Sequence, residues 1–88
     1  MIKPYNYLPS LDLHGIDSEY AKILINDFIN DNYKLKEKRV IIIHGNGQGI
    51  IKKATQTILK NNKLVKEFKI DNFNTGMTIV DLDIKKLK

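Results

Sequence analysis

The spacing of apolar residues along the 88-residue chain predicts two helices. From residue 18 to about residue 30, apolar side chains recur at intervals of three and four, as on an amphipathic helix with one buried stripe. Asp17 or Ser18 is its expected N-cap, and its charged connector follows at residues 34–38. A second helix is predicted from about residue 49 to residue 61. Its inward positions are Ile50, Ile51, Ala54, Ile58 and Leu59.

Four other segments have the pattern of strands. Residues 11–14 alternate apolar and polar positions, whereas residues 39–43 form an unbroken apolar run that is typical of a strand covered on both faces. Residues 64–70 and 77–84 complete the set, and Val80, Leu82 and Ile84 face inward. The order β-α-β-α-β-β predicts an α/β fold, a two-layer sandwich of helices on a four-stranded mixed sheet. A right-handed crossover makes the first two strands parallel.

The length of the chain corresponds to one domain. We expect an extended N-terminal arm over residues 1–10, a folded domain over residues 11–84 and a basic tail over residues 85–88. The absence of cysteine excludes a disulfide framework and a thiolate zinc site. No apolar run is long enough to span a bilayer, and the first residues lack a secretory apolar region. The expected location is therefore the cytoplasm, with no membrane partner.

The charge favours a polyanionic partner. Lysine and arginine total 15 against 10 acidic residues, which gives a formal net charge of +5. Such a balance is typical of proteins that bind DNA or RNA. A lysine-rich surface without any partner has the same composition, so the charge becomes informative only if the cations gather around a binding loop.

A glycine-rich segment follows the apolar strand and precedes the second helix. Residues 44–49 read His-Gly-Asn-Gly-Gln-Gly. Glycines let the backbone approach a ligand closely, and a helix start offers free N–H groups and a partial positive charge. The spacing matches neither the dinucleotide-binding fingerprint nor the P-loop. One glycine suffices for a chain reversal, so three predict a general phosphate-binding turn.

Asp12 and His14 lie on one side of the first predicted strand, with starting points about 6.6 Å apart. Such a pair can serve as a metal ligand and a general acid or base, or can hold one water molecule. A solvated polar strand face is the alternative. Because the carboxyl ends of parallel strands share one edge, His14-Gly15 and His44-Gly45 are expected to flank one crevice.

Three motifs in this chain, taken together, resemble the signatures of the Smr (small MutS-related) domain. They are Leu-Asp-Leu-His-Gly at residues 11–15, the glycine-rich segment at residues 44–49 and Gly-Met-Thr-Ile-Val at residues 76–80. The resemblance covers roughly residues 11–84. It implies a fold like the C-terminal domain of bacterial translation initiation factor three. It also implies a nucleic-acid-binding domain, MutS2-like, often with DNA-nicking or RNA endonuclease activity.

By position, the resemblance implies that Asp12 and His14 are catalytic. The favoured hypothesis is phosphodiester hydrolysis, in which Asp12 orients a water molecule or holds a divalent metal such as Mg²⁺. His14 acts as general base or protonates the leaving oxygen, and His44 binds the developing charge. The expected nucleic-acid-binding residues are Gly45, Asn46, Gly47, Gln48, Gly49, Lys52, Lys53 and Arg39.

Three features of the chain depart from the family pattern. The loop before the third motif is usually glycine-rich in the family, and here residues 72–76 read Asn-Phe-Asn-Thr-Gly. The family usually has a basic residue at the position of Asn46 and often an arginine at that of Lys52. Lysine keeps the charge but lacks the bidentate geometry of arginine. The alternative hypothesis is a non-catalytic module that docks on RNA, DNA or a ribosome. A small-nucleotide site is less favoured, because a domain of this size offers only a shallow pocket. RNA and DNA substrates, and the oligomeric state, stay open.

Overall fold

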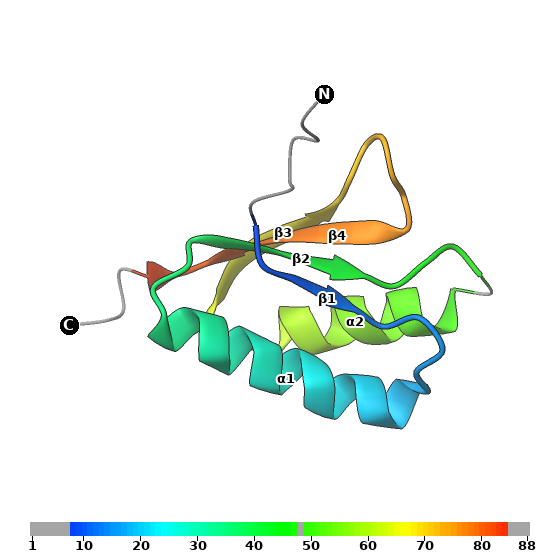
Figure 1. Cartoon of the computed structure of the whole chain (residues 1–88), viewed down its shortest axis with the longest axis horizontal. Helices are drawn as coiled ribbons and strands as arrows, with labels where there is room; N and C mark the ends of the chain where they lie inside the picture. The colour runs from blue at the N-terminus through cyan, green and yellow to red at the C-terminus, as the bar shows by residue number, and fades with distance from the viewer. Residues whose placement is uncertain (1–7, 48, 85–88) are drawn as a thin grey trace.

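Two helices cover one face of a four-stranded sheet in the computed structural model of the chain (Figure 1). The structure describes residues 8–47 and 49–84. The elements in chain order are β1 (Ser10–Asp12), α1 (Ser18–Lys34), β2 (Arg39–Ile43), α2 (Ile50–Lys60), β3 (Val65–Ile70) and β4 (Met77–Leu82). The predicted α/β class and the β-α-β-α-β-β order are confirmed.

The strand order across the sheet is β1-β2-β4-β3. β1 runs parallel to β2, with Asp12 opposite Ile43, while β4 runs antiparallel to both β2 and β3. The sheet is therefore mixed, as predicted. β1, β2 and β3 all end at the same edge, where β4 begins. We call this the loop edge; it comprises residues 13–15, the turn between β2 and α2, and residues 71–76.

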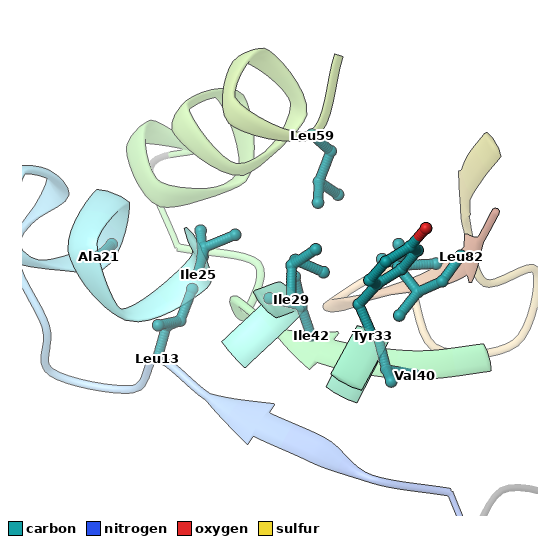
Figure 2. Packing of buried hydrophobic residues seen from close by; sticks show 10 residues of the cluster. Leu13, Ala21, Ile25, Ile29, Tyr33, Val40, Ile42, Leu59 and Leu82 are labelled. Atoms are coloured by element: carbon teal, nitrogen blue, oxygen red, sulfur yellow. The ribbon is translucent and has the colours of Figure 1, made fainter. Parts of the chain in front are cut away.

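The core lies between the sheet and the helices, and Figure 2 shows its packing. Its members come from α1, β2, α2 and β4, with Leu13 just beyond β1. They are Leu13, Ala21, Ile25, Ile29, Tyr33, Val40, Ile42, Leu59, Val80 and Leu82. Ile41, on the opposite face of β2, is only 2% exposed. The apolar run of β2 thus marks a strand that is covered on both faces.

Several element boundaries differ from the prediction. α1 extends to Lys34 because Asn32 Nδ2 donates to the carbonyl of Phe28 at 2.9 Å and Tyr33 packs in the core. Asp17 is its N-cap and accepts a hydrogen bond from the N–H of Tyr20 at 2.8 Å. β1 is shorter than predicted and includes Ser10, and β4 ends two residues earlier. Residues 1–7 and 85–88, most of the predicted arm and the whole tail, lie outside the described residues.

Candidate nucleic-acid interface

Asp12 and His14 lie exposed where β1 ends. The carboxylate oxygen Oδ1 of Asp12 accepts a hydrogen bond from the backbone N–H of His14 at 2.9 Å. Between them, Leu13 is 1% exposed, packs in the core and donates its N–H to the carbonyl of Ile43 at 2.8 Å. Asp12, the last residue of β1, projects from the face that the helices leave open, because its neighbour Leu13 packs in the core. His14 lies in the following turn, which the N–H of Ile16 closes by donating to the carbonyl of Leu13 at 3.1 Å.

The imidazole of His44 is only 8% exposed and has partners at both ring nitrogens. Nδ1 lies 3.0 Å from the carbonyl oxygen of Gly45. A carbonyl only accepts, so Nδ1 carries the proton and donates it. Nε2 lies 2.7 Å from Oγ1 of Thr78 and accepts from that hydroxyl when the ring is neutral. The two contacts fix the tautomer and the orientation of the ring.

Burial lowers the pKa of His44 below its ordinary value of 6.5. The hydrogen bond to Gly45 raises this pKa, and the positive charge of Lys52 lowers it, but burial has the largest effect. Burial therefore favours the neutral ring, in which Nε2 accepts from the hydroxyl of Thr78.

The turn after β2 and the loop before β4 are joined through backbone groups. The N–H groups of His44 and Gly45 both donate to the carbonyl of Gly76, at 2.9 and 2.8 Å. A Cβ at Gly76 would lie 3.2 Å from the Cα of Gly45, so the close approach of the two backbones depends on a glycine here. The turn after β2 is therefore held against residues 75–76.

Asn46 adds side-chain contacts to the same junction. Its Oδ1 accepts from Oγ1 of Thr75 at 3.0 Å and from Nζ of Lys52 at 3.3 Å. Asn46, which stands where the family usually has a basic residue, thus ties the turn to the neighbouring loop and to α2. The turn, the loop and the start of α2 form one connected unit.

The start of α2 has the features of an anion-binding helix terminus. Its N-cap is Gly49, in the left-handed region at φ 82°, where glycine avoids the strain that a side chain would cause. No side chain caps the helix, and its first turn contains no acidic residue but does contain Lys52. The free N–H groups and the partial positive charge of the helix are consequently directed at the loop edge without an acidic partner.

The structure brings together only some of the predicted site residues. The segments that carry His14 and His44 are neighbours, but the ring of His44 turns toward Thr78, which shares the helix-covered face with Ile42. Within the described part of the chain, no hydrogen bond or ion pair joins the side chains of Asp12, His14 and His44. The expected convergence of two exposed histidines is thus absent, because one of them is used inside the domain.

Arg39 lies far from this unit. It begins β2, whereas the glycine-rich turn follows the end of β2, about 13 Å along the strand. Its guanidinium forms a bidentate ion pair with Asp81, with Nε to Oδ1 at 2.6 Å. Lys53 is exposed in α2, Gly47 is exposed in the turn, and Gln48 lies outside the described residues.

Thr78 and the carbonyl of Gly76 are site groups to which the sequence motif alone assigned no role. A signal for Thr78 was present, because it falls on the inward side of a strand whose other inward residues are Val80 and Leu82. A buried hydroxyl requires a partner, and the buried imidazole of His44 supplies it. The role of the Gly76 carbonyl depends on how two distant loops dock, which has no local sequence signal.

The carboxylates at the loop edge do not form a complete metal site. Within residues 8–47 and 49–84, no group of three or more His, Cys, Asp or Glu side chains is placed to hold an ion. Mg²⁺ commonly binds through one or two carboxylates, water and substrate phosphates. Asp12 therefore suits only a metal that shares its coordination with bound phosphate. None of the helices in those ranges combines the length and apolar character needed to cross a bilayer.

The family model for the Smr domain matches residues 11–83, which includes every element except the first residue of β1. The chain belongs to the Smr domain family. This domain is similar to part of the Endonuclease MutS2 of Clostridium acetobutylicum, at 38% identity over 76 residues, which are 83% of this chain and 10% of that protein. The Endonuclease MutS2 of Caldanaerobacter subterraneus is 35% identical over 77 residues, again 10% of its length. The Smr chain thus spans about a tenth of these relatives.

Solved structures show the same fold. The crystal structure of the Smr domain of Thermus thermophilus MutS2 has a TM-score of 0.82 at 23% identity, covering 85% of this chain and 98% of that one. YdaL, a stand-alone small MutS-related protein from Escherichia coli, has a TM-score of 0.79 at 22% identity, covering 83% of this chain and 63% of that one. The Smr fold therefore occurs both within MutS2 and as a stand-alone protein.

Proposed function

We propose that this Smr domain binds a nucleic-acid backbone at the loop edge and hydrolyses a phosphodiester bond there. The observation that carries the proposal is the pairing of two features on adjacent segments. The start of α2, which contains Lys52 and has no side-chain cap, follows β2 in the chain. The exposed Asp12 ends the neighbouring strand β1, and the exposed His14 comes two residues later. β1 and β2 are neighbouring parallel strands, so both features lie at the loop edge, where one nucleic-acid backbone can contact them together.

The proposal gives the three candidate catalytic residues different roles. His14 is the proton-transfer group, because its side chain is exposed and its backbone is held by Asp12 and by the Leu13 contact to β2. Asp12 orients the attacking water. His44 is a positioning residue rather than a ligand for developing charge, since Thr78 and Gly45 engage both ring nitrogens.

The reaction adds one water molecule across a P–O ester bond. The water oxygen forms a new bond to phosphorus, the bond to the leaving oxygen breaks, and the leaving oxygen gains a proton. General acid–base catalysis by a positioned side chain contributes roughly 10²- to 10⁴-fold. The relatives named Endonuclease MutS2 support a nuclease function for the domain, and the net charge of +5 supports a polyanionic substrate.

Two near-isosteric variants test this mechanism. His14→Gln and Asp12→Asn remove the proton-transfer group and the carboxylate from exposed positions, so both should fold with unchanged melting temperature. We expect each to cleave end-labelled RNA or DNA at least about 100-fold more slowly than the wild-type chain while binding it within a few-fold. Asp27→Asn, at an exposed position of α1, is the matched control and should cleave normally.

The outcomes separate the two candidate functions. Equal cleavage by the wild-type chain and both variants removes the assigned roles of Asp12 and His14. Salt-sensitive binding without cleavage of RNA or DNA, with Mg²⁺, Mn²⁺ or no metal added, assigns the domain to the non-catalytic class that docks on nucleic acid or a ribosome.

A further inference from the structure

Phe73 is 99% exposed at the tip of the loop between β3 and β4. The next most exposed large apolar side chain among the described residues, Leu35, is 71% exposed. An aromatic ring whose apolar surface is not buried within its own domain can contact a ligand. Figure 1 shows the loop projecting from the sheet at the edge where β2 leads into the glycine-rich turn.

The loop holds Phe73 in this position through local hydrogen bonds. Asp71 is 5% exposed, and its Oδ2 accepts from the backbone N–H groups of Phe73 at 3.1 Å and of Asn74 at 2.8 Å. Asn74 Oδ1 accepts from the N–H of Gly76 at 3.0 Å, and its carbonyl accepts from the N–H of Met77 at 3.1 Å. The backbone is thus ordered without any contribution from the phenyl ring.

The same loop is docked on the phosphate-binding turn. The carbonyl of Gly76 accepts from His44 and Gly45, and Thr75 contacts Asn46. The loop joins β3 to β4, and β4 and β3 lie two and three strand positions from β1 across the sheet, about 10 and 14 Å. A nucleic-acid strand that crosses the edge from β1 to β3 therefore passes the carboxylate, the positive helix start and the aromatic ring in that order.

We propose that Phe73 stacks on an unpaired base of the nucleic-acid strand whose backbone is bound at the turn. This inference rests on the proposed function and adds the substrate class: single-stranded or locally unpaired RNA or DNA. A base inside a duplex has both faces covered by its neighbours, whereas an unpaired base offers a free face to an aromatic ring. Base–aromatic stacking is tolerant of sequence, so little base specificity is expected from this contact.

The test measures binding of fluorescein-labelled 12-nucleotide single strands, as RNA and as DNA, and of the corresponding blunt duplexes by anisotropy. Phe73→Ala should weaken single-strand binding roughly 5- to 100-fold and duplex binding less than twofold. Phe73→Tyr keeps the ring and should bind within about twofold of the wild-type chain. Leu35→Ala, at the C-terminal end of α1 away from the loop edge, is the matched control for loss of exposed apolar surface and should be silent.

A second readout reports stacking directly. A single strand that contains 2-aminopurine should lose fluorescence on binding to the wild-type chain and to Phe73→Tyr, but not on binding to Phe73→Ala at saturating protein. Because Phe73 is almost fully exposed, the melting temperature should be unchanged in all variants.

The outcomes distinguish this inference from the proposed function. If the wild-type chain and Phe73→Ala bind single strands equally well, the proposed stacking of Phe73 is wrong, although nucleic-acid binding is retained. The exposed ring of Phe73 would then be assigned to a contact with another protein. If Phe73→Ala weakens duplex and single-strand binding equally, the preference for unpaired bases is overturned. If the wild-type chain binds neither RNA nor DNA, both proposals are overturned.

Discussion

At the scale of single residues, two buried threonines show how differently a hydroxyl can be used in this domain. Thr78 and Thr55 are both 0% exposed. Oγ1 of Thr78 lies 2.7 Å from Nε2 of His44, whereas Oγ1 of Thr55 is buried without a hydrogen-bond partner among the described residues. A buried group that loses its partner costs more free energy than the hydrogen bond itself contributes, so the two sites should respond oppositely to the same change.

We expect Thr78→Val to lower the free energy of unfolding by about 1–3 kcal/mol, because it leaves Nε2 of His44 buried and unpaired. Thr55→Val is the matched control. It replaces an unpaired hydroxyl by a methyl group of similar volume, and valine and threonine have similar helix propensities. Its free energy of unfolding should be unchanged or higher by up to about 1 kcal/mol. Urea denaturation measures both values; an equal loss in the two variants contradicts this account of Thr78.

A second prediction concerns the protonation of His44. Burial lowers its pKa in the folded state below that in the unfolded chain, so between the two pKa values only the unfolded state binds the proton. This contribution to stability is complete above about pH 6.5 and is lost as the pH falls below that value. In NMR titrations of the two histidines, the ring of His44 should therefore titrate below pH 6.5.

Denaturation at several pH values measures how the free energy of unfolding depends on the protonation of His44. The wild-type chain and the control His14→Gln should lose more free energy of unfolding on acidification from pH 7.5 than His44→Gln does. The difference between variants isolates His44 from the carboxylates, which also titrate at low pH. A titration of the folded His44 ring at or above pH 6.5 contradicts the prediction.

At the scale of elements, the start of α2 combines a structural cost with features that suit anion binding. Lys52 lies in its first turn, where a cation opposes the helix dipole, whereas Lys60 lies in its last turn, where a cation complements it. The first turn also has no acidic residue and no side-chain cap. These features reduce the stability of an isolated helix but suit a helix start that holds phosphate.

The two lysines of α2 should consequently respond with opposite signs. Lys52→Gln should raise the free energy of unfolding by up to about 1 kcal/mol, because it removes a cation from the first turn; loss of the Lys52 contact with Asn46 makes this gain smaller. The same variant should weaken nucleic-acid binding. It should also reduce the slope of log affinity against log salt concentration by about 1, which corresponds to the loss of one phosphate contact. Lys60→Gln should lower stability by about 0.3–1 kcal/mol and leave binding unchanged. Equal binding losses in the two variants contradict a specific site at the helix start.

At the scale of the whole molecule, the direction of the strands brings the segments of the proposed interface to one edge. β1, β2 and β3 all run toward the loop edge, so three segments far apart in sequence end there. They contribute Asp12 and His14, the turn before α2, and the loop that carries Phe73. The helices form one layer on a single face of the sheet (Figure 1), and Asp12, His14 and Phe73 are exposed at the loop edge, where a long polymer can contact all three segments.

Much of the fold was predictable because its signals are local. The run at residues 39–43 coincides with β2, and the alternation at Val80 and Leu82 identified the inward side of β4. Ile50 was the clearest error in the core, since the apolar spacing placed it inward and it is 58% exposed. The buried face of α2 is formed by Thr55 and Leu59, with Ile51 packed against the core, and Ile50 lies about 100° around the helix from Ile51. Apolar spacing missed this because the central buried residue, Thr55, is polar.

The sequence by itself determined the family, the order of elements and the exposed Asp12 and His14, because motif order, hydrophobic period and strand alternation are properties of neighbouring residues. Only the tertiary structure decided which candidates lie together. It buried His44 against Thr78, paired Arg39 with Asp81 at the far end of β2, and docked the Phe73 loop on the glycine-rich turn. These contacts join residues about 30 to 40 positions apart, and their partners are selected by sheet register and burial.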